Sequence, residues 1–169
     1  MNSIFCKLER KSITMKKVLI AIDYNPVSEK VAQKGYELAQ NLNAEVCLLH
    51  VLDDVGFYGT QYPTFMGYDG YSGMGPDLDV AMEMKNIAEE FMNSAKKHLN
   101  DQQVKTHIAE GPTAKTILSY AEEWGASLLV MGTHSHSVLE KLFLGTVAEK
   151  ILEKTEIPVY LVPVKEKAN

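Results

Sequence analysis

Hydrophobic positions along the chain follow two alternating periods. Short segments rich in valine, isoleucine and leucine have the continuous apolar character of strands that are buried on both faces of a sheet. They are Lys17 to Ile22, Val46 to Val51, Val104 to Ala109, Leu128 to Met131 and Val159 to Val164. Between these segments apolar residues recur at helical spacing, as on one buried face of a helix. The pattern therefore predicts strands that alternate with helices.

Four helices are expected from this spacing and from their end signals. The first is entered through Asn25 and Pro26, the second includes Met84 to Leu99, the third runs from an N-cap at Thr113 to a stop at Gly125, and the fourth runs from Thr146 to about Lys154. Repeated strand-helix-strand units imply right-handed crossovers and a mostly parallel sheet. The predicted fold is a doubly wound α/β domain of five parallel strands with helices on both faces.

In such a sheet, ligands bind beyond the carboxyl ends of the strands, where the strand order reverses. The residues that follow Ile22, Val51 and Met131 are therefore the first candidates for a site. Asp23 follows the first strand, and its carboxylate could accept hydrogen bonds from a ribose or another polyol. The same Asp-Tyr-Asn-Pro sequence also favours a turn, so both interpretations stay open. His50 lies in an apolar run, where a core histidine is commoner than a catalytic one.

The segment from Gly132 to Thr146 leaves a predicted strand and enters a helix. Glycine lets the backbone approach a phosphate closely. Gly145 and Thr146 at a helix N-terminus supply unpaired N–H groups, a hydroxyl and the positive end of the helix dipole. Because glycines are also routine at strand ends and helix starts, these residues alone leave anion binding and an ordinary turn both open.

Four segments occur together in this chain: KKVLIAID, the LLHV that ends at Val51, VMGTHSHSVLEKLFLGTVAEKIL, and IPVYLVP. In this combination the chain resembles the universal stress protein family over residues 15–164. The nucleotide-binding signature of that family is glycine, two residues, glycine, nine residues, then glycine followed by serine or threonine. Gly132, Gly145 and Thr146 match it with the spacing intact, whereas Ser135 replaces the middle glycine.

The resemblance implies a Rossmann-like sheet of order 3-2-1-4-5, a homodimer formed through the last strands and, in one branch of the family, bound ATP. AMP or ADP, with or without Mg²⁺, are the related expectations. Carried over position by position, Asp23 would hold the ribose, the backbone of Val51 would meet the adenine, and Met131 and Gly132 would line the sugar. The residues expected around the phosphates are Ser135, Gly145, Thr146 and Val147.

Ser135 is the departure from the family signature. If this position requires a positive φ, a serine costs on the order of 1 kcal/mol, and its Cβ intrudes where a phosphate would approach. The serine hydroxyl can, however, donate to a phosphate oxygen. Two functions stay open: an adenine-nucleotide-binding regulatory dimer that acts in the stress response, and a nucleotide-free dimeric module that binds unknown protein partners.

Motifs for metal binding and catalysis are weak in this sequence. His134 and His136 could chelate zinc, but a metal site needs a third ligand and none is evident, so no metal site is expected. The chain has no GxxxxGK[ST] loop and no GxSxG elbow. No catalytic residue is therefore expected, and ATP hydrolysis should be slow at most.

The segment from Gly56 to Asp79 holds six of the 11 glycines and four of the eight tyrosines. It is longer than ordinary connections between a strand and a helix. It leaves the ligand-binding end of the predicted sheet, so three interpretations stay open. They are a loop without a defined role, a lid over a nucleotide, and a surface that docks a partner.

The two ends of the chain carry separate expectations. Residues 1–14 are interpreted as a disordered arm or an upstream extension of a domain that spans residues 15–165. Pro158 cannot donate a hydrogen bond to a strand ladder. This places Ile157 to Val164 at an edge of the sheet, where a second subunit could pair.

Charge and cysteine content narrow the classes of partner. The chain has 17 basic and 22 acidic side chains, a formal net charge of −5, so neither nucleic acid nor an anionic membrane surface is expected to bind. Its apolar runs are far shorter than the roughly 20 residues of a membrane-spanning helix, and a soluble protein is expected. Cys6 and Cys47 form no CxxC pair, which favours the reducing cytoplasm.

Overall fold

The computed structural model describes residues 17–53, 78–135 and 145–165. Within these ranges five strands alternate with four helices, as the sequence pattern predicts. The strands are β1 (Lys17–Ala21), β2 (Glu45–Leu52), β3 (Lys105–Glu110), β4 (Leu128–Ser135) and β5 (Val159–Lys165). The helices are α1 (Ser28–Asn41), α3 (Leu78–Leu99), α4 (Thr113–Trp124) and α5 (Thr146–Lys154).

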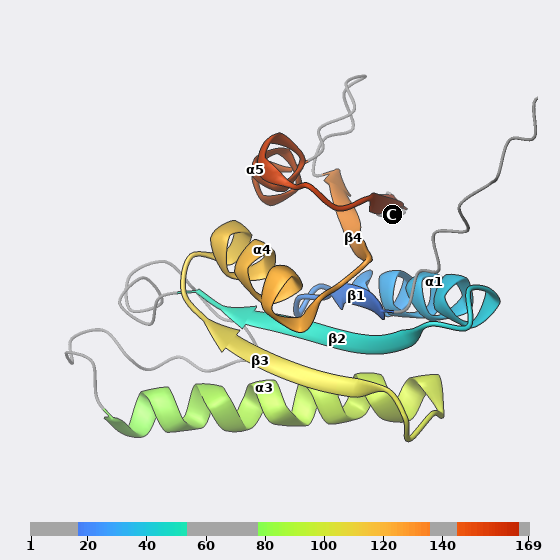
Figure 1. Ribbon diagram of the computed structural model, residues 1–169. Helices are drawn as coiled ribbons and strands as arrows, with labels where there is room; N and C mark the ends of the chain where they lie inside the picture. Colours follow the sequence, from blue (N-terminus) through green and yellow to red (C-terminus); the bar gives the residue numbers. More distant parts are fainter. Residues whose placement is uncertain (1–16, 54–77, 136–144, 166–169) are drawn as a thin grey trace, which may run out of the picture.

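The strands form one parallel sheet in the order β3-β2-β1-β4-β5. Helices α1 and α3 cover one face of this sheet, and α4 and α5 cover the other (Figure 1). The doubly wound fold and the 3-2-1-4-5 order are therefore confirmed. The strand order reverses between β1 and β4, so the carboxyl ends of these two strands mark the crevice where such folds bind ligands.

Successive residues of each central strand point to opposite faces of the sheet and fill two separate core layers. Val18, Ile20 and Leu48 pack in the layer beneath α1 and α3. Leu19 and Leu129 pack in the layer beneath α4 and α5. Burial on both faces is the reason that these strands have no polar alternation in the sequence.

Strand β4 is longer than the sequence pattern predicts. It continues past Met131 because its ladder with β5 continues from Gly132, which pairs with Val162, to Ser135, which pairs with Lys165. Gly132, His134 and Ser135 are not strand-favouring residues, and Thr133 alone is too short a signal, so the partner strand decides this extension. Extended backbone has a negative φ, and the strain expected for a serine at position 135 therefore does not arise.

Two helix starts also differ from expectation. Helix α3 begins at Leu78, before the first periodic residue Met84, so the last two residues of the predicted loop are helical. At the start of α4, Pro112 occupies the N-cap position without a side-chain cap, and the Thr113 hydroxyl donates to Asp53 Oδ2 at 3.2 Å. The expected N-cap at Thr113 is therefore wrong. The C-terminal stop at Gly125 is confirmed by its left-handed φ of 70°.

Some expectations fall on residues outside the described ranges. These are the arm of residues 1–14, most of the Gly56 to Asp79 segment, and His136. Within the described ranges no helix has both the length and the apolar content that crossing a membrane requires.

Candidate functional site

Asp23 lies directly beyond β1, in the turn that leads to α1. Its Oδ1 accepts hydrogen bonds from the Asn25 main-chain N–H at 3.1 Å and from the Ser28 hydroxyl at 2.5 Å. The Asp23 N–H in turn donates to Ser28 Oγ at 3.1 Å. Asp23 is exposed, and both of its hydrogen bonds to described residues use Oδ1, so among these residues Oδ2 is left as an acceptor for a ligand. Asp23 thus stabilises the turn and also presents a carboxylate where the strand order reverses. The turn interpretation and the ligand-binding interpretation of this residue are therefore compatible.

His50 lies at the end of β2, next to Val51, and is 3% exposed. Its Nδ1 is 3.0 Å from the main-chain oxygen of Ile22. Burial lowers the pKa of His50 below its usual value, against smaller opposing effects of the Ile22 hydrogen bond and the Asp23 charge. The side chain is therefore a neutral core histidine, as its apolar surroundings in the sequence indicate.

Val51 and Met131 lie on the α4 and α5 face of the sheet. Met131 belongs to the buried layer on that face, and Val51 packs against the same layer. The pairing of β1 with β4 is recorded only from Val18 with Leu128 to Ile20 with Val130. Within the described residues, the part of β4 from Gly132 onward therefore pairs with β5 alone, and its other edge faces the carboxyl end of β1.

Helix α5 begins at Thr146, and its first turn carries main-chain N–H donors. Gly145 occupies the N-cap position with φ 85° and ψ 144°, and no side chain of the described residues caps this helix. The first recorded helical bond runs from the Glu149 N–H to the Gly145 carbonyl at 3.0 Å. The N–H groups of Thr146 and Val147 thus have the arrangement that binds phosphates at helix N-termini.

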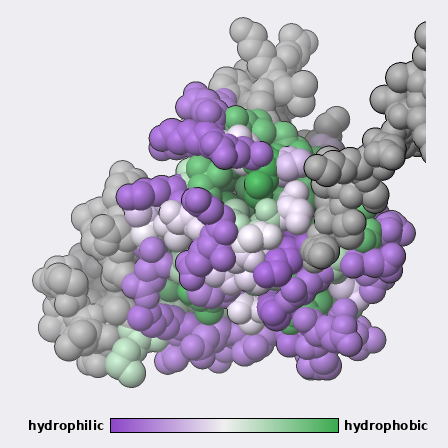
Figure 2. Space-filling model, viewed as in Figure 1, coloured by the Kyte–Doolittle hydropathy of each residue, from purple (hydrophilic) through white to green (hydrophobic). Residues whose placement is uncertain are grey.

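A cavity of about 810 Å³ lies between α4 and α5. Figure 2 shows hydrophobic surface in the space between these helices, bordered by hydrophilic side chains. The predicted residues Thr146 and Val147 line this cavity together with Asp53 and Thr113, which are not among the predicted site residues. Its volume is within the range of small-molecule sites. Asp53 could have been found from its position just beyond a strand end, whereas Thr113 carries no such signal.

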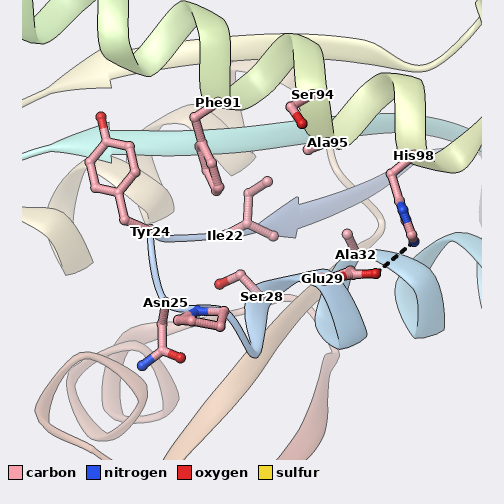
Figure 3. A pocket seen from close by; sticks show the side chains of 11 residues that line it. Ile22, Tyr24, Asn25, Ser28, Glu29, Ala32, Phe91, Ser94, Ala95 and His98 are labelled. Atoms are coloured by element: carbon pink, nitrogen blue, oxygen red, sulfur yellow. Dashed lines mark ion pairs between the residues drawn. The ribbon is translucent and has the colours of Figure 1, made fainter. Parts of the chain in front are cut away.

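A smaller hollow of about 210 Å³ lies on the α1 and α3 face of the sheet, next to the turn that contains Asp23. Figure 3 shows Tyr24 and Phe91 at one end of it and His98 at the other. Glu29 Oε1 and His98 Nε2 are 3.1 Å apart at that other end. The rings of Tyr24 and Phe91 are in contact, with centroids 5.0 Å apart. The sequence pattern gave no sign of this hollow.

Seven of the eight predicted site residues fall into two groups, and Ser135 lies apart from both. Asp23 follows β1, Val51 is the penultimate residue of β2, and Met131 and Gly132 lie in the middle of β4. Gly145 is the N-cap of α5, and Thr146 and Val147 are its first residues. Ser135 ends β4, roughly 13 Å along the strand from Met131 at about 3.3 Å per residue. Among the described residues, no group of three or more histidine, cysteine, aspartate or glutamate side chains is arranged to hold a metal ion.

Comparison with known proteins decides the family. The sequence profile of the Universal stress protein family matches residues 14–163. The chain belongs to the universal stress protein family. A universal stress protein of Methanocaldococcus jannaschii is 32% identical to this one over 155 residues, which cover 89% of this chain and 85% of the relative.

Solved universal stress proteins share the fold. One from Archaeoglobus fulgidus, in complex with dAMP, has a TM-score of 0.56 and 17% identity, over 86% of this chain and 96% of that chain. Another, in complex with cAMP, has a TM-score of 0.63 and 14% identity, over 88% of this chain and 97% of that chain. At these identities the likeness concerns the fold.

Proposed function

We propose that this universal stress protein is a regulatory domain that binds an adenine nucleotide and acts in the stress response as a cytoplasmic homodimer. ATP is the nucleotide proposed, with AMP and ADP as alternatives and Mg²⁺ as the accompanying ion. The observation that carries the proposal is the Asp23 carboxylate, which Ser28 and the Asn25 N–H fix at the point where the strand order reverses. A carboxylate held in this way is a preorganised acceptor for the hydroxyls of a ribose.

Two further observations support an anionic ligand with an adenine base. The first turn of α5 offers main-chain donors that no side chain of the described residues caps, next to the glycine at position 145. Two proteins of the same family and fold were solved with dAMP and with cAMP, which are both adenine nucleotides.

The first experiment asks whether the purified protein carries a nucleotide. We expect that heat denaturation and centrifugation release an adenine nucleotide into the supernatant, identified by chromatography and mass. Calorimetry should then show saturable heat when Mg-ATP is added to nucleotide-free protein. An empty supernatant together with no heat at millimolar Mg-ATP would refute nucleotide binding.

Variants separate the roles of Asp23 and Ser135. Asp23→Asn keeps an Oδ1 acceptor for the turn but removes the charge, whereas Asp23→Ala removes both, so nucleotide affinity should fall in the order wild type, Asn, Ala. The loss in the Ala variant should be about tenfold or more, the equivalent of at least about 1.4 kcal/mol. Ser135→Gly should tighten binding, because it removes a Cβ from the proposed phosphate region. Equal affinities in all four proteins would place the ligand elsewhere.

The alternative is a nucleotide-free dimeric module that binds other proteins. Ser135 favours it, because it replaces a glycine of the family's nucleotide-binding signature. Under this alternative the protein purifies as a dimer, releases no nucleotide and gives no heat with ATP. The release experiment therefore discriminates between the two functions.

A further inference from the structure

Two polar side chains are buried in the described ranges, Ser28 and His50, and both bond to the turn around Asp23. Ser28, 6% exposed, donates to the Asp23 carboxylate. His50, 3% exposed, bonds to the Ile22 carbonyl, one residue before Asp23. Burial of a polar group is unfavourable unless it is hydrogen-bonded. The use of both groups on one turn indicates that the exact course of this turn matters.

The His50 bond occupies the place of a strand-ladder bond. The main-chain N–H of Ile22 still donates to Leu49 at 2.9 Å, but the register of β1 with β2 ends at Ala21 and Leu49. If the parallel ladder continued, the N–H of Val51 would donate to the Ile22 carbonyl. In the described part of the chain Val51 makes no such bond, and His50 Nδ1 bonds to this carbonyl instead. The ring thus stands in place of the ladder bond, and the Val51 N–H has no main-chain partner on β1 among the described residues.

This contact determines the tautomer of His50. A carbonyl oxygen only accepts hydrogen bonds, so Nδ1 must carry the proton. Nε2 is buried and has no hydrogen-bond partner among the described residues, so a second proton there would be an unpaired buried donor. The ring is therefore neutral, with its hydrogen on Nδ1.

Aromatic rings from two other elements hold the imidazole in this orientation. The Tyr24 ring, from the turn, meets it edge-on at a centroid distance of 4.4 Å, and the Phe91 ring, from α3, does so at 5.3 Å. Figure 3 shows these two rings beside Ile22, at the end of the hollow behind the turn. Rotation of the imidazole away from Ile22 would therefore require these two packed rings to move.

We propose that His50 is a positioning residue of the nucleotide site. Its Nδ1–H donates to the Ile22 carbonyl in place of the Val51 N–H. This bond fixes the direction in which the chain presents Asp23. It also keeps the Val51 N–H free to donate to the edge of a purine base. The inference rests on the proposed function for its ligand, but the hydrogen-bond exchange between His50 and Val51 is a property of the protein itself.

The test uses two substitutions in the full-length chain. In His50→Asn the side-chain amide reproduces a donor near the position of Nδ1, so ATP affinity should stay within about threefold of wild type. In His50→Leu the core remains apolar but the donor is lost, and Val51 should pair with Ile22. We expect ATP affinity to fall about tenfold, with the thermal midpoint of unfolding at or above that of the Asn variant.

Nuclear magnetic resonance of the nucleotide-free protein supplies the second readout. Nitrogen-15 shifts should report Nδ1–H in wild type, and the Val51 amide should exchange with solvent faster than in His50→Leu. An Nε2–H tautomer, or a Val51 amide equally protected in both proteins, would overturn the inference. So would His50→Leu binding ATP as tightly as wild type. If wild type binds no nucleotide, the proposed function fails, while the tautomer and amide exchange still decide the role of His50.

Discussion

At the scale of single residues, the buried Cys47 shows how the core controls side-chain chemistry. Its Sγ lies 3.7 Å from the Tyr120 hydroxyl, and the Tyr120 ring stacks on His107 with centroids 3.9 Å apart. Burial raises the pKa of Cys47, and burial together with the Cys47 contact raises the pKa of Tyr120. Because the thiolate is the reactive form, a thiol held protonated and 1% exposed is poorly suited to redox chemistry.

His50 makes stability depend on pH. Its pKa is lowered in the folded state, so as pH falls through about 6.5 the unfolded chain binds a proton before the folded chain does. The free energy of unfolding should therefore decrease between pH 7 and pH 5. Urea denaturation of wild type and His50→Asn at both pH values measures this contribution. A loss of stability as steep in the variant as in wild type would assign the effect to other groups.

At the scale of elements, helix α1 packs so closely on the sheet that a side chain at position 35 would displace its neighbours. A Cβ there would lie 2.8 Å from Ile20 Cδ1 and 3.0 Å from Val130 Cγ1, closer than ordinary contact allows. Lys30, on the same helix, reaches the edge strand β5 and donates to the Pro163 carbonyl at 2.8 Å. The helix thus spans β1, β4 and β5, and its distance from the sheet affects the crevice at the carboxyl ends of these strands.

Gly35→Ala should destabilise the protein despite its gain in helix propensity. The gain is about 1 kcal/mol, whereas overpacking costs about 1 to 3 kcal/mol, so a net loss of about 1 kcal/mol is expected. Ile20→Val removes the nearest atom, Cδ1, and the loss caused by Gly35→Ala should be smaller in that background. Urea denaturation of the two single variants and the double variant measures this coupling. Strictly additive effects would mean that the helix shifts instead of compressing Ile20.

At the scale of the whole molecule, β5 is an edge strand beside exposed apolar side chains. Tyr160 on β5 is 43% exposed, and Leu152 on the preceding helix is 41% exposed. An exposed edge with large apolar side chains is a surface that another chain can pair with. This geometry supports the proposed homodimer through Ile157 to Val164.

A single charged substitution on β5 tests the proposed dimer. Tyr160→Asp should produce a monomer in sedimentation velocity, because it buries an unpaired carboxylate in the proposed interface. Leu42→Asp is the matched control: Leu42 is 36% exposed beyond the C-terminus of α1, and this variant should stay dimeric. A dimer that persists in Tyr160→Asp would place the interface on another surface.

Much of the fold could be predicted from the sequence, because strands and helices each leave a local pattern of apolar residues. Strands buried on both faces need continuous apolar runs, helices need one apolar face, and handedness then leaves few topologies. The end of α4 was predicted as well, because the left-handed residue there is a glycine at position 125. Asp23 and the start of α5 at Thr146 were predicted as site candidates because strand ends and helix starts are visible in the pattern.

Only the tertiary structure decided where strands β1 and β4 end and which distant residues form hydrogen bonds there. Strand β4 continues to Ser135 because β5 lies beside it. Strand β1 stops at Ala21, and the carbonyl of the next residue, Ile22, is hydrogen-bonded by the His50 ring. The partner of the Thr113 hydroxyl, Asp53, is likewise distant in sequence. Local periodicity indicates which face of a helix or strand is buried. Hydrogen bonds between distant residues depend on strand register and on distances that arise only when the helices pack on the sheet.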